Sequence, residues 1–233
     1  MFRRRKKDPE APEQDAPEAA AADDTAATDS PDSAPDRAAG PWDHSDAPED
    51  DVARLDLGSL RVPTLPDVEV RVEADQAGEV SAVLLVHGQS GVQLGAFAAP
   101  RSEGIWGEVR EEIGQGIVAE GGEVDHRSGE FGTELWARVP TPEGPQPVRF
   151  VGVDGPRWFL RAVFTGAAAT EPDAEKVLTE SLRHVVVVRG NDPMPVRDPL
   201  PLRLPKDVVE QAGQPERPTV EPPQRGPEIT EIG

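Results

Sequence analysis

The sequence contains no cysteine. Disulfide bonds, thiolate nucleophiles and the usual structural zinc sites are therefore excluded, and the composition is compatible with a reducing cytosol. No stretch approaches the roughly 18 to 20 consecutive apolar residues that span a bilayer. The first seven residues are followed by acids and prolines instead of the apolar core of a signal peptide. We therefore expect a cytoplasmic protein.

Large apolar residues are also scarce at both ends of the chain. Residues 8–51 contain fifteen acidic residues and one basic residue, Arg37, and residues 206–233 contain six acids, three bases and five prolines. Such segments bury too little apolar surface to offset the entropy that ordering them would cost. We expect disordered tails over residues 1–39, basic and then acidic, and over residues 206–233, with one folded domain over residues 40–205.

The most strongly patterned stretch runs from Ser81 to Gly122. Two apolar runs, 81–87 and 92–99, flank a glycine-containing loop and predict a β-hairpin. Trp106, Val109, Ile113 and Ile117 then recur at helical spacing and define one apolar helix face. Ser102 is the expected N-cap of this helix, and Gly121-Gly122 supplies the left-handed residue that commonly ends one.

Further strands and a second helix are predicted on either side. Residues 67–74 alternate valines with charged residues, as a half-exposed antiparallel strand does, and strands are also expected at 131–139, 148–153, 158–164 and 185–188. Residues 123–129 are polar and are expected to form a solvated loop. Thr170 and Asp173 resemble a capping box before a helix whose apolar face carries Val177, Leu178 and Leu182.

The order of these elements predicts an α+β fold with a curved antiparallel β-sheet and two helices packed on one face. It resembles the Mog1/PsbP-like and type III secretion chaperone-like folds in topology alone. A tryptophan at position 42 is unusual in a polar segment, so residues 40–46 are expected to latch onto the domain. Prolines at 193, 195, 199, 201 and 205 predict an extended C-terminal arm across its surface.

The sequence lacks the motifs of the common catalytic sites. Leu85 to Gly91 resembles the oxyanion-loop segment of α/β-hydrolases, but no Gly-x-Ser-x-Gly nucleophile elbow occurs, so we interpret this stretch as the hairpin. There is no Walker loop and no dinucleotide-binding fingerprint, and no two of the four histidines have the spacing of a metalloprotease helix. We expect no metal, no cofactor and no catalytic residue.

The charge of the predicted domain disfavours nucleic acid as a partner. Residues 52–205 carry a net charge of about −8, whereas phosphate binding needs a basic face. A local exception is the second hairpin, where Arg149, Arg157 and Arg161 alternate with aromatic residues. Such arginines, with aromatic residues beside them, either stack on nucleic-acid bases, bind a partner's carboxylates, or pair with acids of their own domain. The sequence leaves these alternatives open.

Several separated motifs resemble a known family. These are Leu94 to Ser102, Gly104 to Trp106, Gly152 to Trp158 and Pro193 to Arg197, together with Gly40 to Asp43. They closely resemble the actinobacterial family catalogued as domain of unknown function 3710, over roughly residues 40 to 205. The resemblance implies a cytoplasmic actinobacterial protein with an acidic N-terminal tail, and it implies no catalytic residue.

The resulting hypothesis is a non-catalytic protein-interaction or adaptor module. Its expected partner-binding surface comprises Arg101, Arg157, Trp158 and Arg161. One alternative is an enzyme or small-ligand protein with a pocket between helix and sheet near Arg101, Glu103 and His126. A second is peripheral membrane attachment, because Phe2 precedes five consecutive cations that can contact anionic lipid. The basic residues concerned are Arg3, Arg4, Arg5, Lys6 and Lys7.

Overall fold

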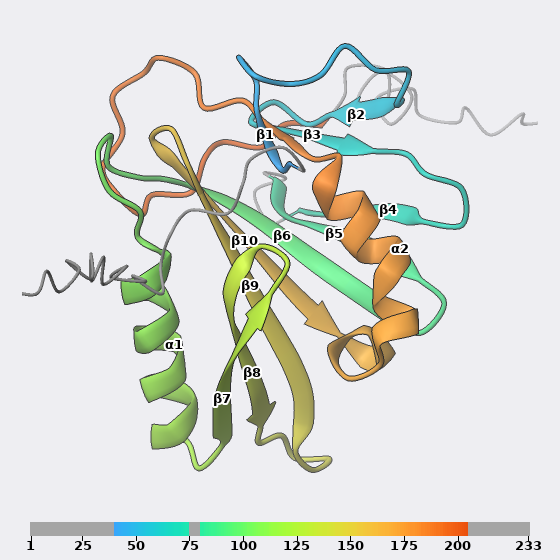
Figure 1. Cartoon of the computed structure of the whole chain (residues 1–233), viewed down its shortest axis with the longest axis vertical. Coiled ribbons are helices and arrows are strands. Elements are labelled where there is room, and N and C mark those ends of the chain that lie inside the picture. The colour runs from blue at the N-terminus through green and yellow to red at the C-terminus, as the bar shows by residue number, and fades with distance from the viewer. Residues whose placement is uncertain (1–39, 75–79, 205–233) are drawn as a thin grey trace, which may run out of the picture. The chain divides into compact units, whose positions relative to one another are not determined.

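A computed structural model describes residues 40–74 and 80–204 of the chain. The predicted tails, including Phe2 to Lys7, lie outside the described residues. Within them, a seven-stranded antiparallel sheet has the order β4-β5-β6-β10-β9-β8-β7 (Figure 1). Its strands are β4 (Glu69–Ala74), β5 (Val80–His87), β6 (Ser90–Ala98), β7 (Glu123–Gly129), β8 (Gly132–Val139), β9 (Gln146–Gly155) and β10 (Trp158–Thr165). The strand direction turns from nearly horizontal at β4 to nearly vertical at β7 in Figure 1.

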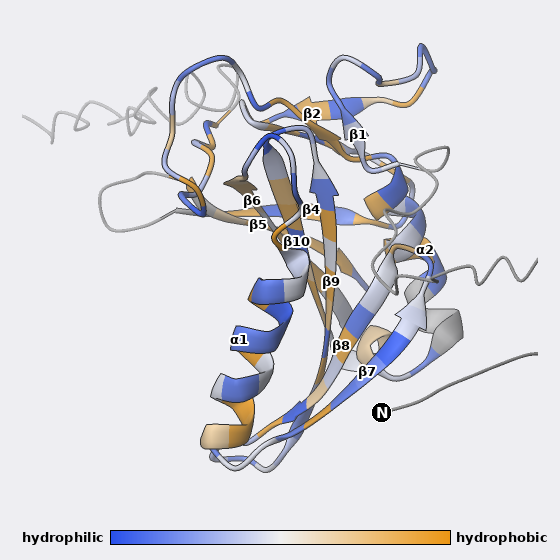
Figure 2. Ribbon diagram, turned by 60° about the vertical axis from the view of Figure 1, so that its left-hand side comes forward, coloured by the Kyte–Doolittle hydropathy of each residue, from blue (hydrophilic) through white to orange (hydrophobic). Residues whose placement is uncertain are grey.

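The two helices lie on opposite faces of this sheet, so the prediction that they share one face is wrong. Helix α2 (Pro172–Arg183) places Leu178 and Leu182 in the main core with Leu160 of β10. Helix α1 (Trp106–Ala119) places Trp106 against Phe159, the preceding residue of the same strand. Since successive side chains of a strand point to opposite faces, the two helices cover different faces. Figure 2 shows the outer side of α1 to be mostly hydrophilic.

Helix α1 is capped by a distant strand and not by Ser102. Its N-cap residue is Ile105, whose side chain makes no capping hydrogen bond. The Asp154 carboxylate, from β9, accepts hydrogen bonds from the backbone N–H groups of Ile105 (2.8 Å) and Trp106 (3.2 Å). A carboxylate there satisfies free N–H groups and complements the helix dipole. Gly121, with φ of +85°, follows the C-terminus as predicted.

A small four-stranded sheet joins the N-terminal segment to the end of α2. Its strands have the order β1-β11-β3-β2. They are β1 (Trp42–Asp43), β11 (Val186–Val187), β3 (Leu60–Pro63) and β2 (Arg54–Asp56). The predicted last strand is thus β11 of this sheet and does not join the main one. Trp42 of the expected latch pairs in parallel with Val186. Helix α2 begins at Pro172 after Glu171, so the predicted capping box at Thr170 is wrong.

The C-terminal arm forms hydrogen bonds with the sheet despite its prolines. Ala98 N–H donates to Asp198 O (2.8 Å), and the N–H groups of Arg197 and Leu200 donate to Ala98 O (2.7 Å) and Ala96 O (2.8 Å). Each donor of the arm is a non-proline residue, which leaves Pro195, Pro199 and Pro201 to supply only carbonyls. The arm therefore borders β6 where its pairing with β5 has ended.

Residues 123–129 form β7, an edge strand, and not the predicted loop. Six of its seven residues are exposed, and Val124 is partly buried. The apolar alternation that identifies a strand is missing because neither face of β7 packs into a core. Its exposed charged residues suit an edge, since charge there discourages pairing with a second chain.

Candidate functional site

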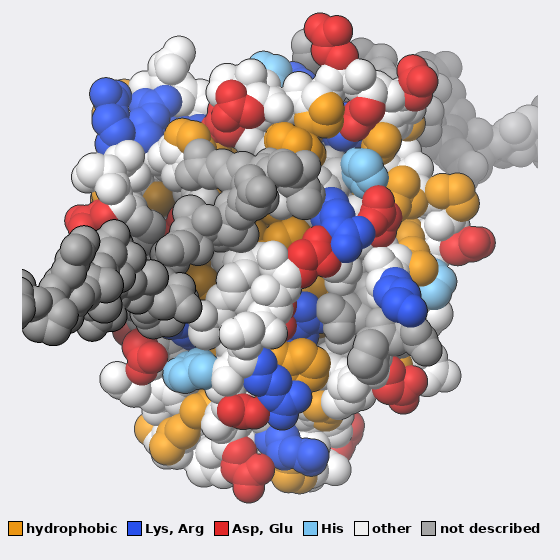
Figure 3. All heavy atoms as spheres, in the orientation of Figure 1, with side chains coloured by type: hydrophobic (Ala, Val, Ile, Leu, Met, Phe, Trp, Pro, Cys, Tyr) orange, Lys and Arg blue, Asp and Glu red, His pale blue; other side chains and the backbone are white. Residues whose placement is uncertain are grey.

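The predicted surface residues lie near the end of the sheet where β9 turns into β10. The Ala99 N–H, from the loop before α1, donates to Arg157 O (3.0 Å) and joins that loop to the turn. Arg101 in the loop is exposed, and Arg157 in the turn is partly exposed. Arg161 lies four residues after Arg157, within β10, and its side chain is on the face of the sheet that α1 covers. Figure 3 shows basic side chains gathered at its upper left, over the loop that follows β11.

Trp158 does not belong to an exposed surface, which corrects the prediction. Its side chain is 2% exposed and packs in the main core with Leu160 and Phe164. The indole Nε1 donates a 2.7 Å hydrogen bond to Asp43 Oδ2, so its polar end is satisfied by the N-terminal latch. The residue that follows the turn faces the core because of the strand register, which the sequence alternation did not reveal.

Arg157 occupies a conformation that arginine rarely adopts. It is the second residue of a two-residue connection between β9 and β10, and its φ is +62°. The left-handed region costs a residue with a Cβ roughly 1 to 2 kcal/mol, whereas glycine enters it freely. The guanidinium donates from Nη2 to Gly190 O (2.9 Å). The chain thus has an arginine at a position where glycine would fit with less strain.

A third arginine, Arg189, completes this end of the domain. Its Nε donates to Arg157 O (3.1 Å) and its Nη1 donates to the backbone O of Asp192 (3.1 Å). Neither contact uses a carboxylate. Arg189 could not be found from the sequence because it lies in an irregular loop with no pattern that places it beside the turn. We call Arg101, Arg157 and Arg189, with the loops that carry them, the basic end.

The arginines at the surface of the basic end have no carboxylate partner. Among residues 40–74 and 80–204, neither Arg101 nor Arg157 forms an ion pair with a carboxylate. Other arginines do pair with acids, as Arg197 does with Glu108 and Glu112 at 3.0 and 2.9 Å, whereas Arg138 and Arg161 also form no ion pair within these residues. The predicted alternative of pairing with acids of the same domain is confirmed for Arg149, which pairs with Glu134 at 2.7 Å, but not for Arg157 or Arg161.

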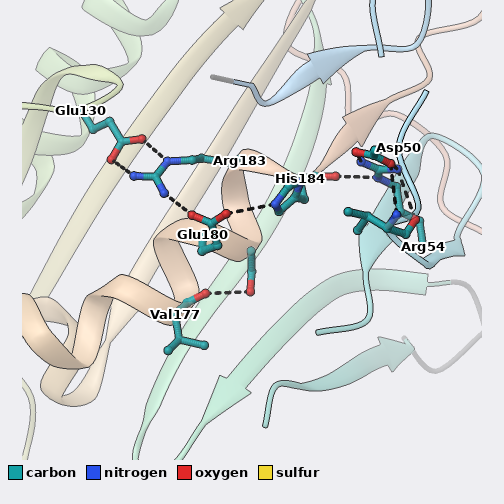
Figure 4. A network of polar contacts seen from close by, with 9 residues as sticks. Asp50, Arg54, Glu130, Val177, Glu180, Arg183 and His184 are labelled. Carbon is teal, nitrogen blue, oxygen red and sulfur yellow. Dashed lines mark hydrogen bonds and ion pairs between the residues drawn. The ribbon is translucent and has the colours of Figure 1, made fainter. Parts of the chain in front are cut away.

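Figure 4 shows arginines that are paired with carboxylates of the chain, at the C-terminal end of α2. Arg183 lies between Glu130 of the β7–β8 turn and Glu180, and these contacts hold the pKa of Arg183 above its usual range. His184 Nε2 lies 3.0 Å from Glu180 Oε1, and Arg54 Nε donates to His184 O (2.8 Å). Each guanidinium here is occupied by carboxylates of the chain, since Arg54 also binds Asp50. This network links elements of the fold and offers no free cation.

Arg101, Glu103 and His126, predicted to lie near a pocket between helix and sheet, do not line three cavities of the described domain. Arg101, Glu103 and His126 are all exposed, and His126 lies on the edge strand β7. They line none of the cavities of about 970, 290 and 230 Å³ in the part of the chain that the structure describes. In that same part, no group of three or more His, Cys, Asp and Glu residues is arranged to hold a metal ion. No helix described there has the length and apolar character needed to cross a bilayer.

The contact between Asp43 and Trp158 predicts a pH effect on stability. Burial disfavours the charged form of Asp43, but hydrogen bonds from Ser45 N, Ser45 Oγ and Trp158 Nε1 outweigh it and lower the pKa of this carboxyl. A lowered folded-state pKa stabilises the fold above the unfolded pKa of about 3.9, and this stabilisation disappears as the pH falls through the folded value. We expect Asp43→Asn to unfold more easily than wild type at pH 7, with the difference shrinking as the pH falls below about 4 and vanishing once the pH is below the folded-state pKa. Urea unfolding at both pH values measures this, and an unchanged difference at low pH contradicts it; Asp51→Asn, at an exposed aspartate, is the control.

The described domain matches a known protein family. A family model described as "Protein of unknown function (DUF3710)" matches residues 40–211. The match confirms the resemblance predicted from the motifs between residues 40 and 205. A search of curated proteins finds nothing that matches.

Proposed function

The chain belongs to DUF3710, a family described as proteins of unknown function. We propose that it is a non-catalytic protein-interaction module of the cytoplasm. Its basic end binds an acidic segment of a partner protein. The single observation that carries the proposal is that Arg101 and Arg157 have no carboxylate partner among the described residues, although the chain has a net charge of −20.

The basic end is also held in place before any partner arrives. The backbone carbonyl of Arg157 accepts from both Ala99 N and Arg189 Nε, which ties the turn to two other loops. The Arg157 guanidinium is itself held by its hydrogen bond to Gly190 O, and a guanidinium held in this way loses less entropy on binding a carboxylate than a mobile one does. Charge-assisted hydrogen bonds of this kind give orientation and specificity to an interface.

The left-handed conformation of Arg157 supports the same proposal. A strained residue that persists where glycine would relieve the strain points to a role for its side chain. The aromatic neighbour Trp158 contributes indirectly, since its burial beneath the turn fixes where the turn lies. This assigns Trp158 a positioning role in place of the contact role that the sequence suggested.

The test is a variant that keeps the fold and removes the charge. Arg157→Gly relieves the left-handed strain, so we expect its free energy of unfolding to stay within about 1 kcal/mol of wild type. Combined with Arg101→Gln, it should reduce capture of the principal partner from lysate at least about tenfold, because two charge-assisted contacts are lost. Affinity capture with the full-length chain and quantitative mass spectrometry measures this.

The matched control is Arg138→Gln. Arg138 is exposed and makes no ion pair within the described residues. It lies next to the C-terminal end of β8, away from the basic end. We expect this variant to capture the same proteins as wild type. If the double variant and the control lose the same amount of captured partner, net charge and not the basic end explains the loss. Capture that the double variant leaves unchanged would refute the proposal.

A further inference from the structure

A second feature lies away from the basic end, where the C-terminal arm leaves β6. The pairing of β5 with β6 runs from His87↔Ser90 to Val83↔Leu94. Further along β6, the arm takes the place of β5 and pairs with it through Phe97↔Pro199. The two strands and the arm line a cavity of about 970 Å³ that is open to solvent. Its lining includes Gln93, Gly95, Phe97, Arg161, Leu202 and Arg203. This volume lies within the range of pockets that bind small molecules.

Arg161 is the unusual member of this lining. Its guanidinium carbon lies 5.2 Å from the centroid of the Phe97 ring, and its Nε is buried without a hydrogen-bond partner. No ion pair joins Arg161 to a carboxylate in residues 40–74 or 80–204. Burial lowers the pKa of Arg161, but arginine still remains charged at physiological pH. A partly buried cation with a free donor is costly unless an anion satisfies it.

A smaller apolar cavity adjoins the first at the same two residues. It has a volume of about 230 Å³ and shares Phe97 and Arg161 with the larger one. Its other walls include Ile105, Val109 and Phe159, which belong to the α1 side of the sheet. The one carboxylate in this lining, Glu112, is bound by Arg197 at 2.9 Å. The Arg161 guanidinium therefore lies beside a cavity whose walls are largely apolar.

We propose that Arg161 binds the carboxylate of a small amphipathic monoanion whose apolar body lies along Phe97. A guanidinium matches a planar carboxylate with two parallel hydrogen bonds, and one partly buried cation balances a single negative charge better than the roughly two charges of a phosphate monoester. Arg203 lines the same cavity but is exposed, so its charge is screened by water. The site is separate from the basic end and does not depend on it.

The test uses octanoate as the probe and octanamide as its uncharged counterpart. Isothermal titration calorimetry with the full-length chain, below the micelle concentration, should show saturable binding of octanoate. Binding of octanamide to wild type, and of octanoate to Arg161→Gln, should each be at least about tenfold weaker. The control Arg203→Gln should weaken octanoate binding less than about threefold, because an exposed charge contributes little.

Two results overturn the proposal. One is the absence of saturable octanoate binding, and the other is equal affinity for octanoate and octanamide, which would indicate non-specific apolar binding. Thermal unfolding of each variant shows whether it folds. If Arg161→Gln does not fold, the comparison of the two probes on the wild-type chain decides the question alone. A change in the ¹⁵N resonance of Arg161 Nε on adding octanoate places the ligand at this residue.

Discussion

Replacing Arg149 with methionine lowers the free energy of unfolding by about 3 to 5 kcal/mol, which is the usual cost of removing one partner of a buried ion pair. Arg149 and Glu134 are each 2% exposed and form two parallel hydrogen bonds of 2.7 Å from Nε and Nη2 to the carboxylate oxygens. Without the guanidinium, the Glu134 carboxylate stays buried and retains the Trp136 Nε1 donor at 3.1 Å. Urea unfolding monitored by circular dichroism measures the loss.

Two further variants separate the ion pair from simple packing. Arg149→Met combined with Glu134→Gln removes both charges, so we expect it to be more stable than Arg149→Met alone. Arg127→Met breaks an exposed pair with Asp125 at 2.8 Å and should cost less than about 1 kcal/mol. A double variant no more stable than the single one would show that the stranded carboxylate is not the cause of the loss.

The second large effect is expected from Trp106→Ala, which should lower the free energy of unfolding by about 3 to 5 kcal/mol. Trp106 is 3% exposed, stacks on Phe159 with ring centroids 5.8 Å apart and donates from Nε1 to Thr133 O (2.6 Å). A Cβ at Gly152 would lie 2.2 Å from the indole, so β9 leaves room for this ring by having no side chain there. The alanine variant loses the contact that docks α1 on the sheet.

The effect should be local to α1. Amide hydrogen exchange in α1 is expected to accelerate more than exchange in β10, because the helix loses its anchor while the main core under α2 remains. The control is Val118→Ala in the same helix, since Val118 is 54% exposed and the change should cost less than about 0.5 kcal/mol. Uniform acceleration of exchange across the sheet would contradict a docking role restricted to α1.

Local patterns predicted most elements, because each core strand or helix has an alternating or helical apolar pattern. The hairpin of β5 and β6 and the apolar face of α1 are examples. Strand β7 was missed because an edge strand without a core face has no such alternation. The helix cap was misassigned because Asp154, 48 residues from Trp106, replaces the local Ser102. The faces of the helices depend on strand register, which long-range pairing determines.

The candidate site was predictable only in part. A two-residue turn exposes the residue within it, and so Arg157 could be found from its position between two strands. Trp158 begins β10, and only the register shows that it faces the core with Leu160. Arg189 reaches the turn through a loop of the small sheet, a contact between residues 32 positions apart. No local pattern carries information about such a contact.

The most direct test of the proposed function is site-specific photocrosslinking in living cells. A photoreactive residue replaces Ser102, the exposed neighbour of Arg101, in the full-length chain, and in a second variant it replaces Arg138. The proposal predicts a covalent adduct with one partner from position 102, at an acidic segment of that partner, and no adduct with it from position 138. Adducts with the same partner from both positions, or from position 138 alone, would contradict the assignment of binding to the basic end.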